Sequence, residues 1–210
     1  MRMRIAGALC VTLNVMVLGA CGLLTNDPTT QSCLIPDEGY ALTDEARGFE
    51  LCLPPNWRDL APGDPGWVTI YGGHDLTVEG EVRDGTIQHF AVPLEPRDAD
   101  TAVNLAIYVR DVDPAVTLDE VATRYEGTLE RANQTVTDRQ SVILPAGQAV
   151  RIETVRPPSE FSTTVDRTVS YVLVHGSRTF HVLYISTEER GDQYESVFDA
   201  SIRSLRFTGD

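Results

Sequence analysis

The stretch Gly48-Phe-Glu-Leu-Cys-Leu-Pro-Pro-Asn-Trp57 decides how the folded part of this chain begins. Every second residue from Phe49 to Leu53 is apolar, which is the period of a strand with one buried face. The two prolines end the run, because proline cannot donate a hydrogen bond to a sheet. We therefore expect a half-buried strand whose Cys52 side chain points away from the core. Trp57 is expected in the following turn, where it would close one end of that core.

Further strands are expected between this first strand and a central helix. Residues 68–71 have the composition of a short strand, and a longer one is expected over residues 103–112. Between them, residues 76–82 and 86–92 flank Arg83-Asp84-Gly85. Because Asp-Gly favours the tight turn of a hairpin, these two segments are predicted to pair.

The second half of the chain has the clearest pattern. Thr117-Leu-Asp-Glu120 fits a capping box, which opens a helix to about Ala132. Four successive strands are then predicted over residues 135–144, 148–155, 165–174 and 179–186. Asp192, with Glu195 three residues later, is predicted to cap a final helix. Helices combined with a largely antiparallel sheet give an α+β fold class.

The two ends of this pattern resemble the PsbP-like superfamily, which includes the LpqN-type lipoproteins of actinobacteria. The resemblance is carried by the stretch 48–57 and by Tyr194-Glu-Ser-Val-Phe-Asp-Ala-Ser-Ile-Arg-Ser-Leu-Arg-Phe207. It implies an antiparallel sheet flanked by helices in an α/β/α sandwich. It also implies a non-enzymatic accessory or binding role, although these motifs are core and turn signatures that bear on fold more than on function.

The N-terminus has the pattern of a secretory signal peptide. Two arginines precede a short apolar run that ends in small residues. Leu18-Gly-Ala-Cys21 resembles the lipobox of bacterial lipoproteins, in which the cysteine is lipidated, with palmitate among the acyl chains, and becomes the first mature residue. This resemblance places the mature protein on the outer face of the cell membrane. The alternatives are an ordinary cleaved signal peptide or an uncleaved anchor over residues 5–24.

These signals divide the chain into three regions. Residues 1–20 are the predicted lipoprotein signal peptide, and residues 21–45 are the lipidated N-terminus and tether. Residues 46–210 are the predicted PsbP-like α/β domain.

Two cysteines remain after Cys21, and they are expected to pair. Outside the cytoplasm an even pair is most simply a disulfide, so we predict a Cys33–Cys52 bond. A loop of about 20 residues closed in this way stabilises a fold by about 3 kcal/mol.

The charge of the chain excludes one class of partner. Without Arg2 and Arg4, which leave with the signal, the mature chain has 15 basic and 31 acidic residues and a net charge of −16. Such a surface repels nucleic acid and anionic lipid headgroups. Membrane contact is therefore expected only through the N-terminal lipid anchor.

No motif points to catalysis, a cofactor or a metal. The four histidines lack the HExxH or cysteine-pair spacing of zinc sites, and they are expected to be solvated or at sheet edges. His181 should pair opposite Val172 in a hairpin. The sequence has no GxSxG elbow. The loops Gly72-Gly-His-Asp75 and Arg156-Pro-Pro-Ser-Glu-Phe161 are the better candidates for a recognition surface.

These observations favour a non-catalytic binding or assembly protein of the bacterial cell envelope. Its partner would be an unidentified envelope protein or a small ligand. The alternatives are a carrier of a small ligand or cation at the cell surface and, less favoured, a hydrolase.

Overall fold

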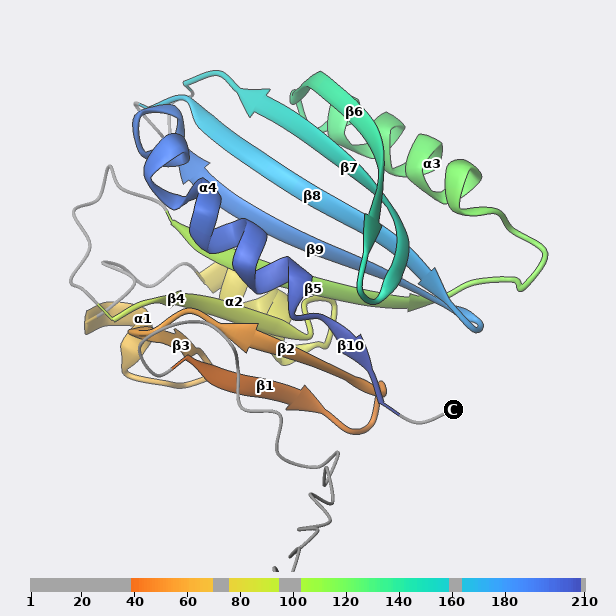
Figure 1. The fold of residues 1–210 in the computed structure, drawn as a ribbon. Helices are drawn as coiled ribbons and strands as arrows, with labels where there is room; N and C mark the ends of the chain where they lie inside the picture. Colours follow the sequence, from red (N-terminus) through yellow and green to blue (C-terminus); the bar gives the residue numbers. More distant parts are fainter. Residues whose placement is uncertain (1–38, 70–75, 95–102, 159–163, 209–210) are drawn as a thin grey trace, which may run out of the picture. The chain divides into compact units, whose positions relative to one another are not determined.

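The computed structural model describes residues 39–69, 76–94, 103–158 and 164–208, all within one compact unit of the chain (Figure 1). The strands are β1 (Tyr40–Asp44), β2 (Phe49–Leu53), β3 (Trp57–Asp59), β4 (His89–Pro93), β5 (Asn104–Asp111), β6 (Thr135–Leu144), β7 (Gly147–Arg156), β8 (Asp166–His175), β9 (Arg178–Thr187) and β10 (Arg206–Phe207). The helices are α1 (Gly66–Thr69), α2 (Leu76–Arg83), α3 (Leu118–Arg131) and α4 (Glu188–Arg203).

Seven strands form one antiparallel sheet in the order β3-β4-β5-β9-β8-β7-β6. The predicted run of four strands is confirmed as the meander β6 to β9. Its register places His181 opposite Val172, as expected from the turn at Gly176.

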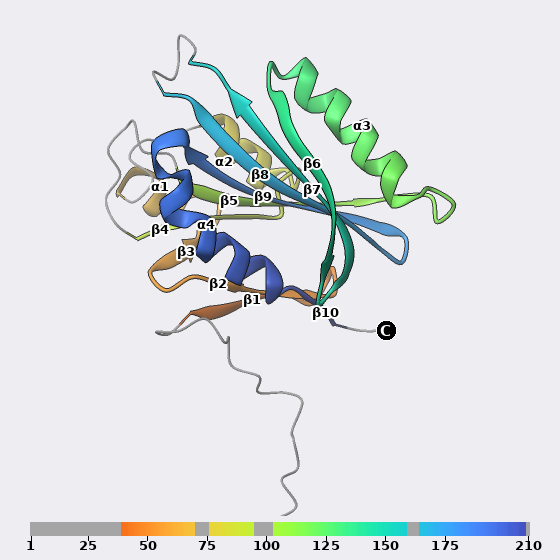
Figure 2. The same cartoon turned by 45° about the horizontal axis from the view of Figure 1, so that its top comes forward.

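Helices cover both faces of this sheet (Figure 2). On one face, α3 packs its buried Val121, Ala122 and Leu129 on β7 and β8, while α1 and α2 cover β4 and β5. On the other face, α4 packs Phe198 and Ile202 on the sheet. The predicted α+β fold, with an antiparallel sheet between helices, is therefore confirmed.

A second sheet, in the order β1-β2-β10, lies beside α4. The predicted strand 49–53 is its central strand, and its side chains at positions 49, 51 and 53 are fully buried. Trp57 is also buried, but it begins strand β3 rather than lying in a turn. Its ring meets the ring of Phe198 on α4 edge to face, so it does contribute to the core.

The central helix is confirmed with its capping box. The Thr117 hydroxyl oxygen accepts a hydrogen bond from the Glu120 backbone N–H, and the Glu120 carboxylate accepts one from the Thr117 N–H. Asp119 and Glu120 lie in the first turn, where the positive end of the helix dipole stabilises their negative charges.

The predicted hairpin over residues 76–92 is wrong, because its first half is helix α2. Val78 and Val82, four residues apart, share the helix face that packs against the buried cluster containing Trp67 and Phe90. Gly85, with φ of +78°, follows the helix, and its N–H donates to the Val82 carbonyl. Asp-Gly therefore ends a helix here. The predicted strand at 68–71 is also wrong over residues 68–69, which belong to α1.

The predicted start of the last helix is wrong by five residues, because the N-cap is Thr187 rather than Asp192. Helix α4 begins at Glu188, and its N-cap Thr187 makes no side-chain capping bond. Glu188 and Glu189 occupy the first turn, where the helix dipole favours acidic side chains. Asp192, the expected cap, lies inside the helix and pairs with Arg167 of β8 instead.

Several predictions concern residues outside the described ranges. These are the lipidated Cys21, the disulfide partner Cys33, the loop 72–75, and residues 159–161 of the second predicted loop. Among the helices of the described residues, none is long and apolar enough to cross a membrane.

Candidate functional site

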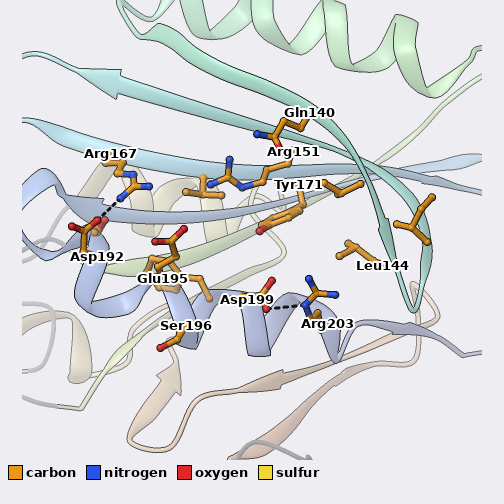
Figure 3. A pocket seen from close by; sticks show the side chains of 16 residues that line it. Gln140, Leu144, Arg151, Arg167, Tyr171, Asp192, Glu195, Ser196, Asp199 and Arg203 are labelled. Carbon is orange, nitrogen blue, oxygen red and sulfur yellow. Dashed lines mark hydrogen bonds and ion pairs between the residues drawn. The ribbon is translucent and has the colours of Figure 1, made fainter.

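A cavity of about 670 Å³ lies between α4 and the strands β6, β7 and β8 (Figure 3). Its floor is apolar, with Val169 and Tyr171 of β8 against Phe198 of α4. Charged side chains from the sheet form one wall, and the acidic side of α4 forms the other.

The two arginines of the sheet wall, Arg151 and Arg167, belong to an ion-pair network centred on the neighbouring Glu153 of β7. Its carboxylate accepts hydrogen bonds from Arg167 Nε at 2.6 Å and from an Arg151 Nη at 2.9 Å. Burial alone works to raise the pKa of Glu153, but the hydrogen bonds from the two arginines outweigh it and hold the pKa below its usual value. Glu153 therefore stays ionised and fixes both guanidinium groups in place.

The network extends across the cavity to the helix. Arg151 also reaches Asp138 on β6 at 3.1 Å, and Arg167 reaches Asp192 on α4 at 3.2 Å. Arg167 can approach this closely because Gly191 has no side chain: a Cβ there would lie 2.8 Å from Arg167 Nη1. The ion pairs thus join strands β6 to β8 to the helix.

The helix wall presents three acidic side chains to the cavity, two of which are paired with arginines. Asp192, Glu195 and Asp199 follow helical spacing along the side of α4 that faces the cavity (Figure 3). The side chain of Asp192 is 93% exposed, and that of Asp199 is half exposed and pairs with Arg203 at 2.8 Å. This wall therefore favours positively charged groups.

An exposed apolar tip completes the rim. The turn between β6 and β7 brings Val142, Ile143 and Leu144 to the cavity, and Ile143 is 76% exposed. Leu94 is the other large apolar side chain that is exposed among the described residues, and it does not line the cavity. An exposed apolar residue beside a charged groove is typical of a protein-binding surface.

The described residues that line the cavity include several charged side chains that are already paired. Its arginines and Glu153 are engaged with one another, and none of the described residues that line it is a histidine or cysteine. Ser186 and Ser196 line it without a neighbouring imidazole to activate them.

His89 has a role that the sequence analysis missed. Its Nδ1 lies 2.8 Å from Asp59 Oδ2, and its Nε2 lies 3.3 Å from Asp44 Oδ2. Burial alone works to lower the pKa of His89, but the two carboxylates outweigh it and raise that pKa above its usual value. The imidazolium form thus ties β4 to β1 and β3. The prediction of a solvated or sheet-edge histidine is wrong here, because both ring nitrogens contact carboxylates and β4 lies inside the sheet.

His181 is not solvated either. Burial lowers its pKa to about 4, so the ring is neutral at physiological pH. It lies under α3, with its centroid 4.7 Å from that of the Tyr125 ring. His175, at the end of β8, stacks on Phe207 at 4.0 Å. Within the described ranges, no three histidine, cysteine or acidic side chains are grouped as metal ligands.

The predicted recognition loops are only partly described. Arg156, which opens the second loop, is bound to Asp166 across the β7–β8 pair and is therefore committed to a structural contact. The cavity beside α4 was not predicted, because its two walls come from segments about 40 residues apart in sequence.

Comparisons with known proteins identify the fold. No family model matches the sequence, and no curated protein matches it. Cyanobacterial PsbP (CyanoP) from Synechocystis superposes with a TM-score of 0.55 at 12% identity, covering 86% of this chain and 99% of that one. LpqN, described as involved in cell envelope biogenesis of Mycobacterium tuberculosis, gives 0.50 at 10% identity, covering 83% and 87%. A Bacteroides thetaiotaomicron protein gives 0.50 at 10% identity, covering 83% and 50%. The predicted PsbP-like fold is thereby confirmed.

Proposed function

Starting from the PsbP-like fold, we propose that this protein is a non-catalytic binding protein of the bacterial cell envelope, anchored by lipid at Cys21. The N-terminal sequence supports the anchor, because a lipobox-like Leu-Gly-Ala precedes Cys21 at the end of the signal peptide. The structural similarity to LpqN, which is itself described as involved in envelope biogenesis, is consistent with an envelope location.

The binding surface of this proposal is the cavity beside α4 together with the apolar tip at Ile143. The occupant is a polypeptide segment that offers basic side chains to the acidic wall of α4 and an apolar contact to the tip. The observation that carries the proposal is the 76% exposure of Ile143 at the rim of a charged cavity. Apolar anchors surrounded by charge are typical of interfaces in which the anchor supplies affinity and the charges supply orientation.

A disulfide between Cys33 and Cys52 belongs to the same proposal. Cys52 is 4% exposed on the central strand β2, and an extracytoplasmic chain with two cysteines in its mature domain favours their pairing. Peptide mapping without reductant should recover a cross-linked pair. Two free thiols in protein secreted by the native host would contradict it.

Site-specific photo-cross-linking in intact cells tests the binding surface. A photoreactive residue at position 143 should capture a discrete partner, whereas the same residue at position 94, the matched exposed apolar position outside the cavity, should not. Replacing Glu195 with arginine in the 143 probe should reduce the yield, because the acidic wall would be partly neutralised. Equal labelling from positions 143 and 94 would count against the proposal.

A further inference from the structure

A second cavity, of about 460 Å³, lies on the opposite face of the seven-stranded sheet from the cavity beside α4. It lies between α3 and strands β5 and β9. Tyr108 and Tyr125 contribute aromatic walls, and Leu183 contributes an apolar floor. A volume of this size holds a small organic molecule.

The polar groups inside this cavity are uncharged. His181 lines it beside its strand neighbour Tyr108, and the lowered pKa of His181 keeps the imidazole neutral. Its Nδ1 is buried without a hydrogen-bond partner among the described residues. Burial raises the pKa of Tyr108 to about 12, so its phenol also stays neutral. The interior therefore suits the apolar body of a ligand.

Two arginines at the rim give the cavity its charge. Arg110 on β5 and Arg124 on α3 are both exposed and line it. Neither guanidinium group has an ion pair or hydrogen bond with another residue in the described part of the chain. The rim carboxylate of Asp111 is instead 3.7 Å from Arg178.

This arrangement contrasts with the cavity beside α4, where Arg151, Arg167 and Arg203 are all paired with carboxylates. In a chain with 31 acidic and 17 basic residues, most arginines are expected to find an acidic neighbour. Arg124 lies within electrostatic reach of Glu120, one turn earlier on α3, and Asp111 follows Arg110 at the rim. Neither guanidinium group forms a close ion pair with these carboxylates, so both can still bind an anion from outside the chain.

We propose that this cavity binds a small anionic amphiphile, with its apolar body between Tyr108 and Tyr125 and its carboxylate, sulfonate or phosphate group between Arg110 and Arg124. The proposal does not depend on the function assigned to the cavity beside α4. It identifies a ligand class by chemistry: an apolar molecule of modest size that ends in one acidic group.

A pair of fluorescent probes tests the charge requirement. 1-Anilinonaphthalene-8-sulfonate carries an acidic group on an aromatic body, and N-phenyl-1-naphthylamine is its neutral counterpart. We expect the wild-type chain to bind the sulfonate saturably, one per chain, and about tenfold or more tighter than the neutral probe. The double variant Arg110→Gln/Arg124→Gln should lose this preference and bind the two probes alike.

Two further variants test whether the probes bind in this cavity. Arg131→Gln changes an exposed arginine of α3 that does not line the cavity, so it should leave both affinities unchanged. Thr128→Trp places a large side chain at the exposed rim, so it should abolish binding of both probes while the melting temperature stays near that of the wild type.

Three results would overturn the proposal: no saturable binding of the sulfonate, an unchanged affinity in the double arginine variant, or wild-type binding by a folded Thr128→Trp variant. Loss of both probes in the double arginine variant would also overturn it, because the arginines would then support the cavity rather than the anion.

Discussion

Replacing Ser201 with alanine tests how α4 is fastened to both sheets. The Tyr184 hydroxyl of β9 donates to Ser201 Oγ at 3.0 Å, and Ser201 Oγ donates to the Cys52 carbonyl of β2 at 2.8 Å. Ser201 is fully buried, and the other two residues are at most 4% exposed. Ser201→Ala leaves a buried hydroxyl and a buried carbonyl without this partner. At about 1–3 kcal/mol for each unsatisfied group, the free energy of unfolding should fall by about 2–6 kcal/mol.

A double-mutant cycle separates this effect from general damage to the core. Tyr184→Phe alone removes one hydrogen bond while Ser201 can still donate to Cys52, so it should cost about 1 kcal/mol. Added to Ser201→Ala, the same change removes the orphaned hydroxyl, so the double variant should be at least as stable as Ser201→Ala. Urea unfolding followed by circular dichroism measures all four chains. Simple additivity of the two single costs would refute the reasoning.

Three other predictions test separate features. Because the pKa of His89 is raised in the folded state, the stabilisation it provides is complete below about pH 6.5 and is lost as the pH rises through the folded value. Urea titrations should show the free energy of unfolding falling over this range, and His89→Gln should remove most of that pH dependence. Gly48→Ala should lower the melting temperature, because φ is +69° and a Cβ would lie 2.7 Å from the Thr208 carbonyl oxygen. Gly127→Ala in α3 should raise the melting temperature, because its Cβ would have no atom within 4 Å and alanine favours a helix. Cys21→Ser should release the protein from membranes or leave an uncleaved precursor; unchanged fractionation and migration would exclude lipidation.

Local signals predicted the second half of the fold well. Both hydrogen bonds of the capping box join Thr117 to Glu120, only three residues later, so the start of α3 could be predicted directly from the sequence. The meander was predictable because glycines with positive φ, Gly147 and Gly176, stand at two of its turns. In these segments the information that fixes the structure lies close together in the chain.

The predictions that were wrong depend on contacts between residues that lie far apart in the chain. Val78 and Val82 fit either a strand face or a helix face, and in the structure they pack as one helix face against the buried cluster that contains Trp67. The charge of His89 depends on Asp44, which lies 45 residues away, and Arg167 is joined to a helix acid 25 residues away. One local sign of the cavity was present: Arg151 and Glu153 alternate on one face of a strand, which is unusual for a face that packs against a helix.

The small sheet also sets an order of folding. Strand β10, near the C-terminus, pairs with Glu50 and Phe49 of β2, so this sheet joins segments more than 150 residues apart. Helix α4, which covers the core between the sheets, likewise follows strands β1 to β9 in the chain. Contacts between such distant segments form late, and they make folding slower. The small sheet therefore cannot form completely until α4 and β10 are available to pack against the early strands.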